Sequence, residues 1–184
     1  MTQLETPIKF SYRDYQNLPE SETKRYELLE GELVMVPAPS WFHQSIAGTL
    51  FQLLAQFVRG KALGEVRFAP LDVVLSEEDV VQPDILFVSN ERRRIIHEDG
   101  IHGAPDLHIE ILSPTTAGRD RTLKRTLYAR HGVREYWLVD PETKTIEVLR
   151  LGPQGYQLAG HYERGQTLRS PLLAGLIIPL DEVF

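Results

Sequence analysis

The sequence predicts an α/β domain in which a mixed central β-sheet is flanked by helices. Three observations predict it. Short segments rich in apolar and β-branched residues recur along the chain, an amphipathic helical pattern follows Ser40, and a strand–helix–strand pattern spans residues 107–139. The strand–helix–strand unit predicts a parallel crossover, and the hairpins predict antiparallel pairs, so the sheet should be mixed.

The composition fits one globular domain over residues 1–184. The chain is 42% hydrophobic and 25% charged, and its length is short for two domains. It has no cysteine, which excludes disulfides, thiolate metal sites and cysteine nucleophiles. The N-terminus lacks the basic and apolar parts of a signal peptide, and the apolar tract 172–180 is shorter than the roughly 20 residues of a membrane span. We therefore expect a cytoplasmic protein without a membrane partner.

The first predicted elements are a hairpin and a helix. Residues 26–36 read as two short strands that turn at Glu30-Gly31, and prolines at positions 37 and 39 end the second strand. Ser40 is a suitable N-cap for the helix that follows. The apolar positions of this helix, separated by four, four, three and four residues, are Phe42, Ile46, Leu50, Leu53 and Phe57.

A second hairpin is predicted next. Its strands are residues 66–75 and 80–88, joined by a polar turn at 76–79. Residues 92–105 are polar and contain glycine, which indicates a loop or a short helix. Residues 107–112 then form a strand that carries His108 and Glu110 on one face.

The crossover and two further strands complete the predicted domain. Residues 113–116 can cap a helix from about Gly118 to His131, and Gly132 suits its C-terminal end. Residues 135–140 and 145–151 read as strands around a turn. The unit from 107 to 139 should be a right-handed parallel crossover, and Tyr128, Tyr136 and Trp137 are expected in the core.

Charge is distributed unevenly along the chain. The net charge of −6 argues against a protein that coats nucleic acid through bulk electrostatics. Residues 91–134, however, hold nine basic and six acidic residues, so this part is +3 and the remainder −9. A basic face here would suit transient contact with a phosphate backbone, and a solvated charged helix is the alternative. The basic residues are Arg92, Arg93, Arg94, Arg119, Arg121, Lys124, Arg125, Arg130 and Arg134.

Several common catalytic signatures are missing from the sequence. It has no Gly-rich phosphate loop, no Gly-x-Ser-x-Gly elbow, no His-Glu-x-x-His motif and no dinucleotide fingerprint. Nucleotide-dependent motors, serine hydrolases and zinc proteases are therefore disfavoured.

Two carboxylates inside strands are the main chemical signal. Asp84 lies in a strongly apolar run, and Glu110 lies between two isoleucines. If their strands are adjacent, the carboxylates approach to about 4 Å and repel by roughly 4 kcal/mol at an effective dielectric of about 20. A bound dication, or protonation of one acid, would relieve this. Lys124 on the crossover helix can reach the same place, and such a set can activate water against phosphate.

The motifs around these residues resemble the Uma-two-type endonuclease family of the PD-(D/E)XK restriction-endonuclease-like superfamily. The resemblance covers residues 26–141, and the C-terminal strands and tail, 142–184, lie beyond it. It rests on Pro83-Asp84, Ile109-Glu110-Ile111-Leu112-Ser113-Pro114-Thr115-Thr116, Asp120-x-x-x-Lys124, Gly132-Val133-x-Glu135-Tyr136-Trp137-Leu138-Val139-Asp140-Pro141, the segment 26–33 and His43.

The resemblance implies a restriction-endonuclease-like fold and a site for Mg²⁺, for which Mn²⁺ should substitute. Its ligands would be Asp84, Glu110 and the main-chain carbonyl of Ile111. The superfamily lysine belongs two residues after the acid, where this chain has Leu112. The Uma-two-type proteins supply it from the next helix, which makes Lys124 the candidate.

We therefore expect a metal-dependent endonuclease that hydrolyses phosphodiester bonds in nucleic acid, with DNA as the expected substrate. Arg119, Arg121 and Arg125 are the expected contacts to its backbone. One alternative is a catalytically silent nuclease fold that binds nucleic acid or a protein partner. Another is a metal-dependent hydrolase of a small phosphorylated metabolite. Apolar residues in 172–184 would suit a homodimer, while the choice of DNA or RNA and any sequence specificity stay open.

Each candidate residue also has a structural alternative. Asp84 could cap a strand end, Glu110 could pair with Arg67, and Lys124 could form a surface pair with Asp120. Four further residues are candidates for an auxiliary role: Glu27, Glu32, His43 and Asp72. We favour Glu32 among them, and expect a solvent-facing Glu27, a core His43 and a hydrogen-bonded Asp72.

Overall fold

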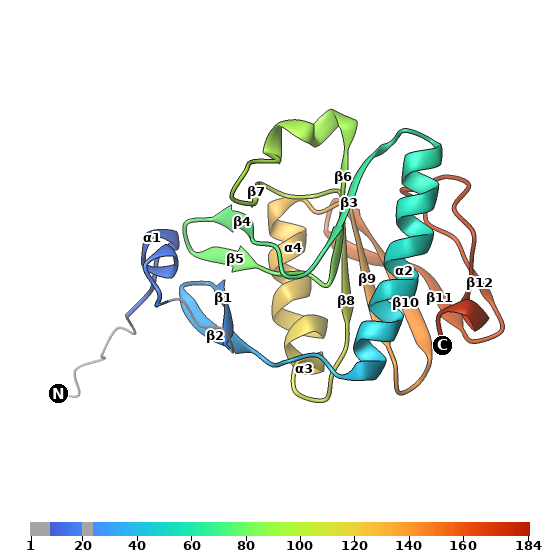
Figure 1. Cartoon of the computed structure of the whole chain (residues 1–184), viewed down its shortest axis with the longest axis horizontal. Coiled ribbons are helices and arrows are strands. Elements are labelled where there is room, and N and C mark those ends of the chain that lie inside the picture. The colour runs from blue at the N-terminus through green and yellow to red at the C-terminus, as the bar shows by residue number, and fades with distance from the viewer. Residues whose placement is uncertain (1–7, 20–23) are drawn as a thin grey trace.

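The computed structural model describes residues 8–19 and 24–184 and shows two large sheets and a two-stranded one, β12-β13, with helices packed around them (Figure 1). A six-stranded and a five-stranded sheet carry most of the strands. In chain order the elements are α1 (Tyr12–Gln16), β1 (Arg25–Leu29), β2 (Glu32–Val36), α2 (Trp41–Gly60), β3 (Gly64–Phe68), β4 (Val73–Ser76), β5 (Asp79–Val81), β6 (Ile85–Ser89), the 3-10 helix η1 (Asn90–Ile95), β7 (Ile101–His102), β8 (Leu107–Ile111), α3 (Ala117–Arg119), the π-helical turn η2 (Asp120–Lys124), α4 (Arg125–His131), β9 (Glu135–Asp140), β10 (Thr145–Gly152), β11 (Gly155–Glu163), β12 (Thr167–Leu168), β13 (Ile178–Pro179) and the 3-10 helix η3 (Leu180–Glu182).

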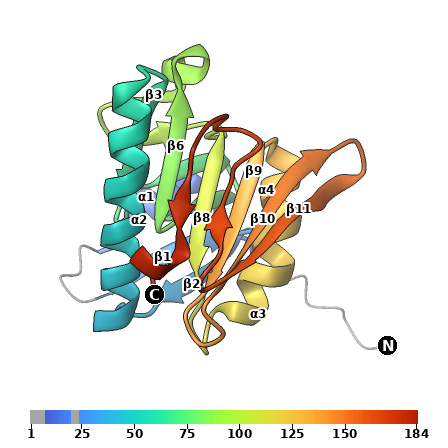
Figure 2. The same ribbon diagram turned by 90° about the vertical axis from the view of Figure 1, so that its right-hand side faces the viewer.

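The six-stranded sheet has the order β11-β10-β9-β8-β6-β3 and forms the middle of the molecule. Its β8 and β9 are parallel, as the crossover pattern predicts, and its other neighbours are antiparallel. Alternate residues of a strand face opposite sides. Ile85 of β6 packs in the core that contains α2, while Leu86 packs in the core that contains α4. Helices therefore cover both faces (Figure 2), and the predicted fold class is confirmed.

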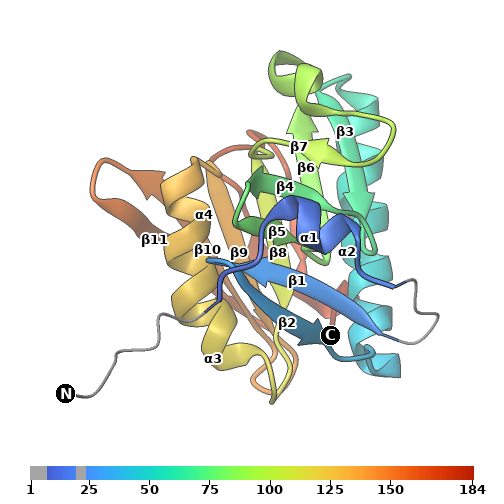
Figure 3. The same ribbon diagram turned by 90° about the vertical axis from the view of Figure 1, so that its left-hand side faces the viewer.

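The second predicted hairpin is divided between the two sheets, which corrects the expectation of one central sheet. β3 pairs with β6 in the six-stranded sheet, whereas β4 pairs with β5 in the five-stranded sheet β2-β1-β5-β4-β7 (Figure 3). The break falls at Pro70 on one strand and at Pro83 on the other. Proline has no N–H for a ladder and restricts the residue before it. Asp84 consequently lies where the two sheets separate.

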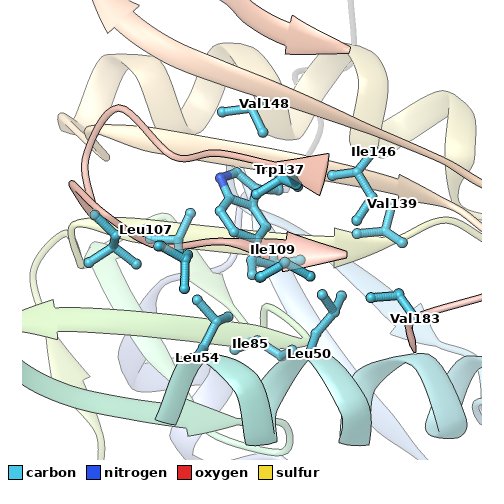
Figure 4. Packing of buried hydrophobic residues seen from close by; sticks show 14 of the residues in the cluster. Leu50, Leu54, Ile85, Leu107, Ile109, Trp137, Val139, Ile146, Val148 and Val183 are labelled. Carbon is cyan, nitrogen blue, oxygen red and sulfur yellow. The ribbon is translucent and has the colours of Figure 1, made fainter. Parts of the chain in front are cut away.

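Helix α2 packs on the six-stranded sheet through one stripe of residues. Ser40 caps it, because its Oγ accepts the N–H of His43 at 3.1 Å, as predicted. The buried stripe is Ile46, Leu50, Leu54 and Val58. The predicted positions Leu53 and Phe57 pack only partly buried beside it. Figure 4 shows Leu50 and Leu54 facing the strand residues of this core.

The apolar C-terminal residues pack on the protein's own core rather than forming an exposed patch. The buried residues of this segment are Leu173, Leu176, Ile178, Leu180 and Val183. Val183 lies beside the α2 side of the core in Figure 4. Ile177 is 54% exposed. The expectation that this segment offers a dimer surface is therefore not supported by its burial.

No helix within residues 8–19 and 24–184 has both the length and the apolar composition needed to cross a bilayer.

The turn between β4 and β5 depends on one buried acid, Asp79. Its carboxylate accepts hydrogen bonds from the N–H of Glu30 at 2.8 Å and the hydroxyl of Ser76 at 2.8 Å, and lies 3.0 Å from His131 Nε2. Burial raises the pKa of Asp79, but these hydrogen bonds outweigh it and lower the pKa below the ordinary 3.8. The charged form is therefore favoured by folding.

We expect Asp79→Asn to lower the free energy of unfolding by about 1–3 kcal/mol at neutral pH, since it weakens hydrogen bonds to a charged group. Because the folded pKa is depressed, this contribution is present above the unfolded pKa of 3.8 and is lost as the pH falls through the folded value. Denaturant unfolding at neutral pH and below pH 4 measures the difference. Glu77→Gln, in the exposed part of the same turn, is the control. A pH-independent difference would contradict the assignment.

Candidate active site

Glu110 lies in β8, and Asp84 lies directly before the adjacent antiparallel strand β6 rather than within a strand as predicted. Ile85 of β6 is paired with Ile109 of β8, so one residue further along Asp84 lies opposite Glu110. Asp84 Oδ2 also accepts the N–H of Ile111 at 2.7 Å, which holds its side chain against β8. Both acids line a cavity of about 820 Å³. The structure thus brings these residues together, and their roles stay a prediction.

Lys124 lies at the centre of a buried group of acids. Its Nζ is 2.9 Å from Glu27 Oε1, 3.0 Å from Glu110 Oε1 and 3.6 Å from Asp120 Oδ1. Lys124 is 4% exposed, so a surface pair with Asp120 is the wrong interpretation. The partner of Glu110 is this lysine, whereas Arg67 pairs with Glu65 at 3.0 Å. We call Glu27, Asp84, Glu110, Asp120 and Lys124 the acid–lysine cluster.

A π-helical turn places two members of this cluster. The predicted helix runs through α3, η2 and α4 and ends at Gly132, whose φ of 83° is left-handed as expected for such a cap. Within it, η2 is a wide turn, a feature that is frequent at functional sites. The hydroxyl of Tyr136 donates to the carbonyl of Asp120 at 3.1 Å. Asp120 and Lys124, at the two ends of this turn, are both buried toward the sheet.

Tyr128 adds a hydrogen-bond donor to Glu110. Its hydroxyl donates to Glu110 Oε1 at 2.6 Å, and its ring packs edge-on against His108 and Tyr136. The sequence indicates only that Tyr128 is buried, which is confirmed at 0% exposure. The sequence could have predicted Tyr128 at this site from its spacing. It follows Lys124 by four residues and Asp120 by eight, and residues spaced in this way share one helical face.

Burial and the neighbouring charges control protonation in the cluster. Burial, more than any other cause, raises the pKa of Glu110 well above its usual value, and the ammonium of Lys124 opposes this. Burial also raises the pKa of Asp120. For Lys124 burial acts the other way, but the surrounding carboxylates outweigh it and raise its pKa, so it stays protonated. Three carboxylates surround the ammonium and Asp84 acts on Glu110 as a fourth acid, so the acids outnumber the one cation.

The arrangement fits a hard divalent cation. Within the residues that the structure describes, no three histidine or acidic side chains form a metal cluster, but the expected set has two side chains and the Ile111 carbonyl. Asp84 accepts its hydrogen bond through Oδ2, and Glu110 accepts through Oε1. The second carboxylate oxygen of each makes no hydrogen bond to a described residue. The buried Asp120 Oδ1 also has no hydrogen-bond partner there. Oxygen donors in an anionic setting are what Mg²⁺ prefers.

The structure places the candidates for an auxiliary role in different surroundings. Glu27 is 2% exposed and binds Lys124, so the expectation that it faces solvent is wrong. Glu32 is exposed at the start of β2 and does not line the cavity. Asp72 accepts from the Tyr15 hydroxyl at 2.9 Å and from Gln82 Nε2 at 2.7 Å, outside the cluster.

His43 lines the cavity instead of packing as a satisfied core residue. Its Nε2 lies 3.2 Å from Asp84 Oδ2, and its buried Nδ1 has no partner among the described residues. Burial lowers the pKa of His43, but the hydrogen bond and charge of Asp84 outweigh it, and the pKa is raised. His43 therefore helps to orient the Asp84 carboxylate.

The expected backbone-contact residues differ in their surroundings. Arg121 pairs with Asp140 at 3.0 Å and with Glu147 at 3.2 Å. Arg125 donates to the carbonyl of Tyr156 at 3.2 Å. Arg119 lines the cavity and makes no ion pair with any residue that the structure describes. Of the three, Arg119 is best placed to meet a phosphate.

At a pH above the raised pKa of Glu110, we expect Tyr128→Phe to lower the free energy of unfolding by about 1.5–3 kcal/mol, because it removes a hydrogen bond to a charged acceptor. Tyr156→Phe is a matched control, since its hydroxyl donates at 2.7 Å to the neutral carbonyl of Val133. That bond should contribute about 0.5–1.5 kcal/mol. Urea unfolding of both variants gives the comparison, and equal losses would mean that Glu110 is not charged in the folded protein.

Comparison with known proteins agrees with this fold. Residues 12–181 match the Uma2 family, described as "Putative restriction endonuclease". The crystal structure of "a putative nuclease belonging to DUF820" from Anabaena variabilis superposes with a TM-score of 0.78 at 24% identity, over 95% of this chain and 97% of that one. The uncharacterized protein slr1290 of Synechocystis sp. is 23% identical over 96% of this chain and 92% of its own length. A second Synechocystis protein, sll1609, is 25% identical over 73% of this chain and 76% of its own.

Proposed function

Because this chain belongs to the Uma2 family, described as "Putative restriction endonuclease", we propose that it is a metal-dependent nuclease that hydrolyses phosphodiester bonds in DNA. The observation that carries the proposal is the meeting of Asp84, Glu110 and Lys124 in one cavity. Family membership supports nuclease activity in general terms. The metal and the substrate are proposed from the family resemblance, and the roles of the residues from that resemblance together with their geometry.

The cation would be Mg²⁺ or Mn²⁺, held by Asp84, Glu110 and the main-chain carbonyl of Ile111. When bound there, it would polarise the phosphate and lower the pKa of a bound water. The N–H of Ile111 and His43 hold the Asp84 carboxylate, while Lys124 and Tyr128 hold that of Glu110. These contacts fix both carboxylates before a substrate arrives, which reduces the reorganisation that catalysis requires.

Lys124 would supply the positive charge that stabilises the developing charge on the phosphoryl oxygens, or would orient the attacking water. Glu27 and Asp120 hold its ammonium from two further sides. A fixed charge in a site with little water acts more strongly than a mobile charge in solvent. Glu27 is thus proposed as a positioning residue that acts through Lys124.

One observation favours a catalytically silent nuclease fold as the second candidate. The ammonium of Lys124 already has three carboxylate neighbours, which offset its charge before any phosphate binds. A protein of this kind would bind nucleic acid without cutting it. Binding that persists in EDTA, together with no cleavage under any metal, is the outcome that would favour it.

A cleavage assay with supercoiled plasmid and with single-stranded DNA tests the proposal. The wild type should cut with Mg²⁺ or Mn²⁺ and stop when EDTA is added. Asp84→Asn should cut at least about 100-fold more slowly, because the contribution of a metal ion to the transition state is several kcal/mol. Equal cutting by both proteins, or none by either, refutes the proposal. Hydrolysis of a small chromogenic phosphate ester in place of DNA would instead identify a metabolite hydrolase.

A further inference from the structure

We propose that the cavity takes unpaired nucleotides, whose bases stack on Phe42 and Phe68 while a backbone phosphate reaches the acid–lysine cluster. The inference rests on the proposed nuclease function and specifies its substrate class as single-stranded or locally unpaired nucleic acid. It is carried by the position of these two rings, by the depth of the acids and by the charge of the rest of the lining.

Each of the two phenylalanines precedes, in the chain, a residue that contacts Asp84. Phe42 precedes His43, whose Nε2 is 3.2 Å from Asp84 Oδ2. Phe68 ends β3 and precedes Ala69, whose N–H donates to the carbonyl of Asp84 at 3.0 Å. Phe68 is also paired with Ile85, the residue after Asp84. Two phenylalanines from different elements therefore lie beside residues that contact Asp84, and both line the same cavity as that acid.

These rings are unusually accessible for phenylalanine. Phe42 is 56% exposed and Phe68 is 54% exposed, and both line the cavity. Phe68 packs edge-on against Phe51 of α2 with ring centroids 4.7 Å apart, which supports it from behind. A supported, accessible ring is a platform on which any base can stack, since every base has a π-face.

The depth of the acids argues for an unpaired strand. Glu110 is 5% exposed and Lys124 is 4% exposed, so a phosphate must enter the cavity to reach them. The cavity, of about 820 Å³, is in the range of pockets that enclose a small molecule. Nucleotides of a single strand can enter such a space one after another. A duplex keeps its bases stacked and paired, and would need to extrude a nucleotide first.

The charges of the lining are arranged to suit a phosphate backbone outside the cluster. Arg25 of β1 and Arg119 of α3 both line the cavity. Neither forms an ion pair within the described part of the chain, in contrast to Arg121, which two acids neutralise. Aromatic platforms combined with basic side chains are the usual equipment for binding single strands without sequence preference.

Binding measured by fluorescence anisotropy tests the inference. The probe is a labelled oligothymidylate of about 20 nucleotides, with Ca²⁺ replacing Mg²⁺ to avoid cleavage. A strand of equal length with abasic sites keeps the phosphates and removes the bases, and a duplex of equal length keeps the bases but pairs them. We expect the oligothymidylate to bind most tightly. Phe42→Ala and Phe68→Ala should each weaken its binding by about 5- to 150-fold and leave abasic binding unchanged.

Leu158→Ala, at a residue that is 60% exposed on β11 and does not line the cavity, is the control and should change nothing. Abasic or duplex probes that bind as tightly as oligothymidylate, or phenylalanine variants with unchanged affinity, overturn the inference. Cleavage of both the plasmid and the oligothymidylate separates this failure from that of the proposed function. If the protein cuts DNA but binds the oligothymidylate no more tightly than the abasic strand, only the proposed substrate class is wrong. Base-dependent binding without cutting under any metal retains the single-strand site and removes the nuclease.

Discussion

Lys124→Met is expected to lower the free energy of unfolding by about 3–5 kcal/mol, because it leaves buried carboxylates without their cation. Methionine has a similar length but no charge. Glu27, Glu110 and Asp120 would then face one another, each 5% exposed or less. Denaturant unfolding at neutral pH measures the loss. Plasmid cleavage by the same variant, assayed well below its unfolding temperature, should also fall.

Lys9→Met is a matched control for this prediction. Lys9 Nζ lies 2.9 Å from Glu78 Oε2, the same distance as that between Lys124 and Glu27, but both side chains of that pair are at least half exposed. Solvent screens such a pair, so its loss should be far smaller. Adding Glu27→Gln to Lys124→Met should recover part of the stability. Comparable losses in Lys9→Met and Lys124→Met would show that the cluster is not a charged, buried network.

The part of the site that lies within one continuous segment was predictable from the sequence. A glutamate between two isoleucines predicts that Glu110 lies in a strand, which is confirmed, and an aspartate in an apolar run predicts the same for Asp84, which lies directly before β6. The crossover predicts that the helix after β8 returns to the same sheet, and Lys124 does reach Glu110. These inferences use short separations along the chain and the regular geometry of strands and helices.

Glu27 could not be placed in this way, because its position depends on how two sheets meet. It belongs to the five-stranded sheet, and the N–H of Gln82 donates to its carboxylate at 2.8 Å. That contact exists only because the strand breaks at Pro83 and its two halves enter different sheets. Polar and apolar residues alternate around Glu27 and Glu32. This alternation is the same whether the polar side of the strand faces solvent or is covered by a second layer of the protein. The choice of Glu32 as auxiliary residue followed from that ambiguity.

Glu110→Gln is expected to reduce the cleavage rate by at least about 100-fold, because the neutral amide removes a ligand charge from the proposed cation site. The folded protein should be no less stable than the wild type, since the change removes a buried charge while keeping an oxygen that can accept from Lys124 and Tyr128. Single-turnover cleavage and denaturant unfolding test these two parts, and Mn²⁺ titration calorimetry should show weaker Mn²⁺ binding because a ligand charge is lost.

Glu27→Gln is the matched control for Glu110→Gln. Each of these glutamates contacts the Lys124 ammonium through one of its own carboxylate oxygens, at 2.9 Å for Glu27 and 3.0 Å for Glu110. If Glu27 acts only through Lys124, its amide variant should bind Mn²⁺ as the wild type does and lose less cleavage than Glu110→Gln. Equal loss of Mn²⁺ affinity in both variants would move Glu27 into the ligand set. Wild-type cutting by Glu110→Gln would remove Glu110 from the chemistry and leave its bond to Lys124 as a structural ion pair.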